Sequence, residues 1–324
     1  MITRNDYSSL TGKLNAIFVE TSAAAIAESE GMKFFGVKET DWFTYDHRIL
    51  HGLAGIEEVA DGADLPRVNS DEGDTASVSQ RYFGAIVSIT KGIRKFDRYD
   101  KAEDLVRSIT DDAWDGIDQS FADVLTFGWS TSYTDVWGAS VTSTGPDGES
   151  LFNSAHSNGT SSTTYSNLIN DGTNNNPTLS RAAVVESRSL SLVYKDPEGK
   201  VRPIKLDTLL VPANLEDLAE RIILSNQMSG VADNDINPLK GKIKNIVVWP
   251  RLDTRTGGTD TSNYYFLYDS RKVKESLQAL FAERPELDPP EEVYENKNWY
   301  YSIDFYYNIL HGFPAYIRGS NASA

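Results

Sequence analysis

Residues 100–127, DKAEDLVRSITDDAWDGIDQSFADVLTF, decide how the rest of the sequence is interpreted. Apolar side chains recur there at helical spacing: Ala102, Leu105, Val106, Ile109, Ala113, Ile117, Phe121, Val124 and Leu125. Asp100 followed by Glu103 matches a capping box, and Gly128 is a typical C-terminal stop. At 1.5 Å per residue the predicted helix is roughly 40 Å long, so we expect other elements to pack on it.

Upstream of this helix, residues 41–96 suggest a long β-hairpin. Aromatic and β-branched side chains in residues 42–50 and 81–93 favour two strands, the second returning along the first. Residues 57–74 between them are too charged for a core and predict an exposed tip. Its charged side chains are Glu57, Glu58, Asp61, Asp64, Arg67, Asp71, Glu72 and Asp74. Residues 1–40 hold one imperfect amphipathic helix, which we expect to be a peripheral arm outside the core.

Downstream, residues 128–180 change character. Ser, Thr, Asn and Gly make up 33 of these 53 residues, and none is Lys or Arg. Such a stretch cannot form a core of its own, so we expect surface loops with short strands.

The remainder predicts alternating helices and strands, followed by a strand-rich C-terminus. We expect a helix at 182–193, a strand at 206–211 leading into a helix capped by Asn214, strands at 243–249, 263–268 and 299–310, and a loop at 283–295. Residues 271–283 fit either a helix or a strand.

Composition excludes several classes of protein. The chain has 324 residues, no cysteine and a formal charge of −16, so disulfides and thiolate zinc sites are impossible. A groove for phosphates needs clustered basic residues, which are missing. The acidity either keeps nucleic acid from adhering to the protein or merely aids solubility. No signal peptide or membrane span is visible, so we expect a soluble protein made in the cytoplasm.

Candidate catalytic chemistry is sparse. His156 lies near Asp147 and Ser154 in sequence, but no nucleophile elbow is present. The alternative is that His156 pins a loop through a hydrogen bond. His47 and His51 have the i, i+4 spacing of a helical metal pair without further ligands, and their context favours a strand. We therefore assign no catalytic, cofactor-binding or metal-ligating residue and expect no cofactor and no enzyme activity.

Two motifs resemble the major head subunits of tailed phages, notably the Mu-like group. The first is Gly148-x-x-Leu151-Phe152-x-x-x-His156, followed by Asn158. The second is the strand-then-helix Leu209-Leu210-Val211-Pro212-Ala213-Asn214-Leu215-Glu216, continuing through 219–225. Three later segments follow in the same order as in that group: Val247-Val248, residues 263–267 and the aromatic strand from Trp299. The resemblance therefore spans residues 100–318.

This resemblance implies an α+β Hong Kong 97-type capsid fold. Its parts would be an N-terminal arm (1–40), an extended hairpin or E-loop (41–96), a peripheral domain (97–185) with a spine helix (100–127), an α/β axial domain (186–290) and strands returning to the peripheral domain (291–324). It implies self-assembly into hexamers and pentamers of an icosahedral head around double-stranded DNA, without sequence-specific contact. A scaffolding protein or protease, a portal and decoration proteins would be further partners, with assembly in the host cytoplasm and no membrane.

We expect inter-subunit contacts between the acidic tip and basic residues of a neighbouring subunit. The candidates are Lys91, Arg94, Lys95 and Arg98. Two alternatives stay open: an encapsulin-like nanocompartment shell of the same fold, or a secreted glycan-binding or hydrolytic β-rich protein.

Overall fold

The computed structural model describes residues 4–50, 58–59, 64, 72–96, 100–158, 161–227 and 236–323. The chain divides into two compact units. The first comprises Met1–Tyr45, Val78–Phe121 and Ala279–Ile309; the second comprises Asp46–Ser77, Ala122–Gln278 and Leu310–Ala324. Both contain helices and strands, which confirms the α+β class.

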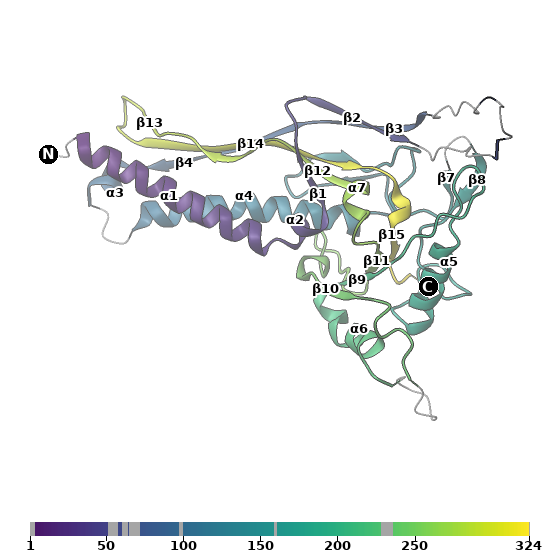
Figure 1. Cartoon of the computed structure of the whole chain (residues 1–324). Helices are drawn as coiled ribbons and strands as arrows, with labels where there is room; N and C mark the ends of the chain where they lie inside the picture. Colours follow the sequence, from purple (N-terminus) through teal and green to yellow (C-terminus); the bar gives the residue numbers. More distant parts are fainter. Residues whose placement is uncertain are drawn as a thin grey trace. The chain divides into compact units, whose positions relative to one another are not determined.

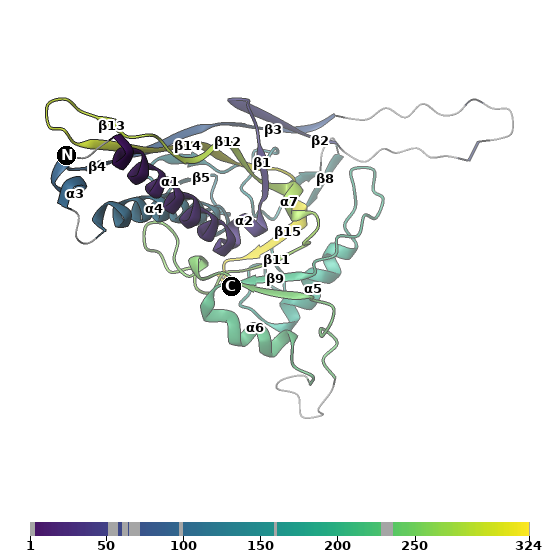
Figure 2. The ribbon, with the colours of Figure 1, turned by 60° about the vertical axis from the view of Figure 1, so that its left-hand side comes forward.

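The helices of the first unit are α1 (Arg4–Glu28), α2 (Glu30–Phe34), α3 (Lys91–Phe96) and most of α4 (Lys101–Thr126). Helix α1 lies alongside α4 (Figures 1 and 2), and Lys13 of α1 forms an ion pair with Glu103 of α4. Leu14, Ile17 and Phe18 of α1 are buried. The expectation that residues 1–40 stay outside the core was therefore wrong for this face of α1.

Helix α4 confirms the predicted long helix and its apolar stripe. Six of the stripe residues are almost completely buried: Ala102, Val106, Ile117, Phe121, Val124 and Leu125. The capping box is not formed, because Asp100 has a φ of 51° instead of the extended backbone of an N-cap. Its carbonyl accepts hydrogen bonds from the N–H groups of Glu103 and Asp104. The Glu103 side chain engages Lys13.

The sheet of the first unit has the strand order β1-β12-β14-β13, with β4 also paired to β14. Its strands are β1 (Gly36–Glu39), β12 (Leu277–Leu287), β14 (Trp299–His311), β13 (Glu291–Glu292) and β4 (Arg81–Ile89). Alternate residues of β14 are buried up to Tyr307, as expected for a strand with one face on the core. The Tyr307 hydroxyl lies 2.7 Å from Ser120 Oγ of α4, so this buried face meets the long helix.

Strand pairing corrects the predicted hairpin. Strand β2 (Thr44–Leu50) pairs with β3 (Glu72–Ser79), which begins inside the segment assigned to the tip. Strand β4, expected to return along β2, instead runs antiparallel to β14, with Arg81 opposite Tyr307 and Ile89 opposite Trp299. Residues Lys91–Phe96 continue as helix α3. The predicted loop at 283–295 contains the end of β12 and β13, and the ambiguous stretch before it is a short helix, α7 (Val273–Ser276), followed by β12.

The second unit is built on the sheet β10-β9-β11-β15. Its strands are β10 (Asn245–Val248), β9 (Thr208–Val211), β11 (Tyr265–Tyr268) and β15 (Ile317–Ser320). The pair β10–β9 is parallel, and β11 is antiparallel to both β9 and β15. One face packs Leu209, Val211 and Leu267 against the buried residues of α5 (Arg181–Leu192) and α6 (Glu216–Ile223). This confirms the strands and helices predicted for residues 182–268.

The opposite face of this sheet is also covered. Phe266 is paired with Leu210 and Gly319 in the sheet, and its ring stacks on Phe152, with ring centroids 5.4 Å apart. A sheet buried on both faces explains the continuous apolar character of these strands.

The helix after β9 begins differently from the prediction. Asn214 belongs to a 3₁₀ turn, η1 (Ala213–Leu215), and Leu215 is the N-cap residue of α6. The Asn214 amide donates instead to the carbonyl of Ser262, at 3.4 Å. The 3₁₀ turns η2 (Pro250–Leu252) and η3 (Pro314–Tyr316) also belong to this unit.

The polar stretch 128–180 forms the short strands that its composition predicted. They are β5 (Ser132–Thr134), β6 (Ser140–Thr142), β7 (His156–Asn158) and β8 (Ser161–Tyr165). The stretch also contributes buried apolar residues, among them Leu151, Phe152 and Ile169. It is therefore held to the core of its unit by a few large side chains.

Candidate functional site

The predicted acidic tip is described in part. Glu57, Asp61, Arg67 and Asp71 lie outside the described residues, as does Arg98 of the basic group. Glu58 and Asp64 are exposed, Glu72 begins β3, and Asp74 within β3 is half-buried. The described acids thus include two that a neighbouring molecule could reach.

The basic candidates Lys91, Arg94 and Lys95 lie on α3. Lys91 and Lys95 are exposed, and the backbone N–H of Lys91 is anchored by Asn298 Oδ1 at 3.3 Å. Glu58, Asp64 and Asp74 belong to the second compact unit, whereas these bases belong to the first. The expected meeting of the two groups across a subunit boundary stays a prediction.

An apolar surface on β4 was not predicted from the sequence. Tyr82 and Ile86 point to the same side of the strand and are 59% and 70% exposed. The Tyr82 ring packs on Tyr306 of β14, with centroids 4.7 Å apart, and its hydroxyl donates to Asp304 Oδ2 at 3.1 Å. Trp42 and Phe43, just before β2, are 72% and 66% exposed. The alternation of this strand was visible in the sequence, but the face that stays uncovered was not.

The best catalytic candidate, His156, is completely buried. Its Nδ1 lies 2.7 Å from Asp147 Oδ2 and its Nε2 lies 3.1 Å from Asn167 Oδ1. The Asn167 amide nitrogen donates to the carbonyls of Leu151 and Pro314, which leaves Oδ1 as the acceptor facing the ring. Both ring nitrogens therefore lie within hydrogen-bond distance of a side-chain oxygen.

This geometry confirms that His156 pins a loop. Burial alone would raise the pKa of Asp147, but the hydrogen bond and charge of His156 and the backbone N–H groups of Glu149 and Ser157 hold it below its ordinary value. Ser154, the nucleophile candidate, is exposed, whereas His156 is enclosed. The three residues do not form a triad with an accessible nucleophile.

Two glycines allow the neighbouring Phe152 to pack. A Cβ on Gly128 would lie 2.6 Å from Phe152 Cε2, and one on Gly319 would lie 2.8 Å from Phe152 Cε1. The ring also packs against Trp129, with centroids 4.7 Å apart. The motif of Leu151, Phe152 and His156 thus has a structural role. Phe152 fills an aromatic core, and His156 holds polar loops through its hydrogen bonds.

Metal-binding candidates find no support in the described part of the chain. His47 lies on strand β2, as its neighbours suggested, and His51 is outside the described residues. Within the described residues, no group of three or more His, Asp or Glu side chains could hold a metal ion. None of the described helices has the length and apolar character needed to cross a membrane.

Comparison with solved structures shows which fold these units form. The capsid of Myoviridae phage XM1 is 12% identical, with 90% of each chain covered and a TM-score of 0.53. The bacteriophage JBD30 capsid is 11% identical, covering 71% of this chain and 92% of that one, with a TM-score of 0.53. The capsid of the native GTA particle is 9% identical, covering 93% and 89%, with a TM-score of 0.51. These likenesses confirm a Hong Kong 97-type capsid fold.

A family model described as phage capsid protein matches residues 72–317, which is most of the chain. No curated protein matches the sequence. The chain belongs to the phage capsid protein family, and it is a major capsid protein of a phage head. The family is one of structural proteins, in keeping with a His156 cluster that anchors loops.

Proposed function

We propose that many copies of this chain assemble into the hexamers and pentamers of an icosahedral phage head that encloses double-stranded DNA. The exposed apolar surface of Tyr82 and Ile86 carries the assembly part of this proposal. Large apolar side chains grouped on one strand face of a soluble protein typically mark a contact with another molecule. Obligate contacts of this kind bury on the order of 2,000 Å² or more, enough to hold a shell together.

The parts of the subunit are assigned from the fold family. We infer that β2 and β3 form the E-loop hairpin and that α4 is the spine helix. We assign the sheet β10-β9-β11-β15 to the axial domain proposed for residues 186–290, and β12 and β14 to the peripheral domain. Of the segment 291–324, the part through Ile309 would then return to the peripheral domain, whereas β15 stays with the axial sheet. Residues 1–40 are the N-terminal arm, with the apolar face of α1 packed in the first unit.

Electrostatics would guide the early contacts. The acidic hairpin tip of one subunit meets α3 of a neighbour, where Lys91 and Lys95 are exposed. Exposed ion pairs are screened by salt, with a Debye length near 10 Å at 0.1 M, so salt weakens these contacts. The charge of −16 keeps the packaged DNA from adhering to the shell, consistent with binding of DNA without sequence-specific contact.

Further partners follow from the same proposal. A scaffolding protein or protease, a portal and decoration proteins would act with this subunit in the host cytoplasm, and no membrane is involved. A nanocompartment of the same fold would differ in its cargo, which is an enzyme instead of DNA.

The test of the charge-guided contact is a pair of variants. Lys91→Glu combined with Lys95→Glu reverses the exposed charge of α3. As the control, Lys205→Glu combined with Lys242→Glu makes the same change at exposed lysines of the second unit. Light scattering should show slow, salt-insensitive assembly for the first pair and normal assembly for the second. Equal assembly of both pairs would remove the proposed role of α3.

A further inference from the structure

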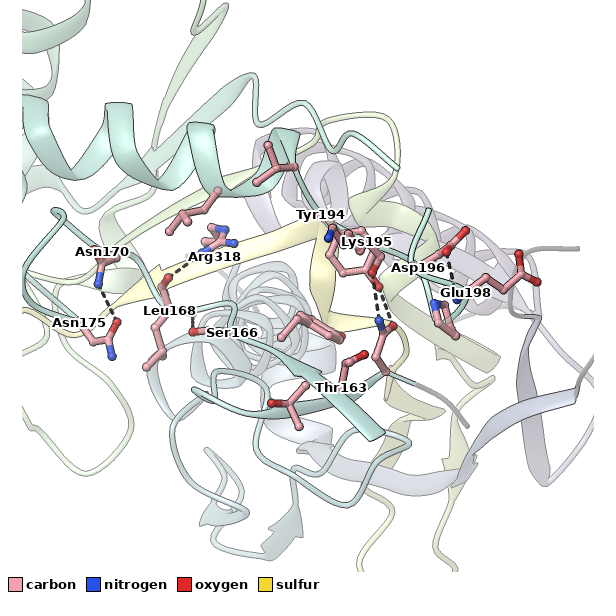
Figure 3. A pocket seen from close by; sticks show the side chains of 17 residues that line it. Thr163, Ser166, Leu168, Asn170, Asn175, Tyr194, Lys195, Asp196, Glu198 and Arg318 are labelled. Carbon is pink, nitrogen blue, oxygen red and sulfur yellow. Dashed lines mark hydrogen bonds between the residues drawn. The ribbon is translucent and has the colours of Figure 1, made fainter. Parts of the chain in front are cut away.

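A pocket of about 700 Å³ opens in the second compact unit (Figure 3). Its apolar walls include Leu168, Leu190 and Val193, and Tyr194 and Arg318 also line it. All of these residues belong to the same compact unit, and Arg318 comes from strand β15. None of its lining residues belongs to the surfaces assigned above to subunit assembly.

Arg318 is a buried cation whose hydrogen bonds are incomplete. Its side chain is 8% exposed, its Nε donates to Ser191 Oγ at 2.7 Å, and its Nη1 donates to the Leu168 carbonyl at 2.9 Å. A guanidinium has five N–H donors, so five less these two leaves three without an acceptor among the described residues. Burial lowers the pKa of Arg318 to about 10, which still leaves it charged at neutral pH.

The carboxylates that line the pocket are engaged with other bases. Asp196 Oδ2 accepts from Arg202 Nε at 3.0 Å, and Glu198 lies 3.5 Å from Lys200 Nζ. No ion pair of Arg318 is present in the described part of the chain. A buried charge without a partner is costly, by several kcal/mol per ion in typical proteins. The pocket therefore offers a cation without an ion-pair partner among the described residues, in a lining that is partly apolar and partly polar.

This chemistry suits a carboxylate on a short aliphatic stem. The planar guanidinium binds carboxylates through two parallel hydrogen bonds, and Leu190 and Val193 can pack against methylene groups. Lys195, which also lines the pocket and is exposed, adds a second positive charge. An Asp or Glu side chain has the required head group and stem.

We propose that this pocket binds an Asp or Glu side chain from a neighbouring copy of this chain, with Arg318 as its principal ligand. The occupant is assigned to a second copy because the chain has 47 acidic against 31 basic residues and exposes acids outside the hairpin tip, such as Glu216 and Glu220. The claim that the carboxylate comes from a second copy rests on the assembly proposed above. The claim that the pocket binds a carboxylate does not depend on that assembly.

The first experiment tests the pocket in solution, without assembly. N-acetylglutamic acid α-amide is titrated into the full chain while the Nε–H signal of Arg318 is followed by NMR. We expect a saturable shift with a Kd on the order of 1 mM, and no shift with the neutral N-acetylglutamine amide. The signal is assigned by its loss in Arg318→Lys. Absence of any saturable shift would overturn the proposal.

The second experiment tests the source of the carboxylate. Arg318→Gln is compared with Arg188→Gln, a matched control whose Nε donates to the Leu206 carbonyl outside the pocket. We expect Arg318→Gln to raise the subunit concentration needed for shells by about tenfold or more, with Arg188→Gln near wild type. Wild-type assembly of Arg318→Gln would overturn the role of the second copy. Failure of the wild type to assemble would count against the proposed function, while the titration still decides the chemistry of the pocket.

Discussion

Nδ1 of His156 lies 2.7 Å from Oδ2 of Asp147, and the same imidazole reaches Oδ1 of Asn167 at 3.1 Å. One ring thus joins three parts of a stretch in which Ser, Thr, Asn and Gly predominate. In a region with few large apolar side chains, buried polar bonds of this kind specify one conformation.

Substitution of His156 by Ala should destabilise the subunit. The change leaves Asp147 and Asn167 without their buried partner, at an expected cost of about 1–3 kcal/mol in the free energy of unfolding. Urea denaturation followed by circular dichroism measures it. Ser154→Ala, at an exposed position of the same loop, is the control and should stay within about 0.5 kcal/mol of wild type. Equal stability of both variants would show that the cluster does not anchor the loop.

Acid should destabilise the protein through His311. Burial lowers the pKa of His311 to about 4, against an ordinary value of 6.5, so the unfolded state binds its proton first. The stability of the folded state is therefore complete above pH 6.5 and falls as the pH drops toward 4, by up to about 3 kcal/mol. His311→Gln should flatten the dependence of unfolding free energy on pH in this window. An unchanged slope would contradict the burial of a neutral imidazole.

Gly31 should not tolerate a larger residue. A Cβ there would lie 2.9 Å from the Phe121 Cβ and 2.9 Å from Asp118 Oδ1, so we expect Gly31→Ala to cost about 1–3 kcal/mol. Gly12 of α1 has open space, so Gly12→Ala should be neutral or stabilising by up to about 1 kcal/mol. Thermal unfolding of the two variants, which lie in the same compact unit, compares them directly. Similar melting temperatures would refute the close packing of α2 on α4.

The exposed surface of β4 should matter for assembly and not for folding. Ile86→Glu places a charge on a side chain that is 70% exposed, so the unfolding midpoint should change little. Sedimentation should show that this variant fails to form shells, because a charge buried in an apolar contact is costly. Ile86→Thr keeps the β-branched shape and should retain partial assembly. Normal shells from Ile86→Glu would place the contact elsewhere.

The parts of the fold set by local periodicity were predictable from the sequence. The apolar stripe of α4 and the alternation of β14 depend on residues within one element, and both were confirmed. Strand pairing was not predictable, because β4 could pair with β2 or with β14, which lies more than 200 residues later. Likewise the apolar face of α1, whose spacing is imperfect, becomes visible only when Leu14 is seen to be buried.

The candidate sites divide in the same way. The role of His156 followed from its neighbours in sequence, whereas Arg318 was missed because nothing in the segment Ile317–Ser320 marks its arginine as buried. Its burial depends on Ser191 and Leu168, which lie far away in the sequence.

Electron microscopy of the purified full chain tests the central claim most directly. The protein is imaged at low salt, which favours assembly because salt screens the expected charge contacts. A series of protein concentrations is compared. The account predicts closed shells of uniform size, or rings with fivefold and sixfold symmetry. A chain that stays monomeric at every concentration, while folded by circular dichroism, would contradict self-assembly of this subunit without a scaffolding protein.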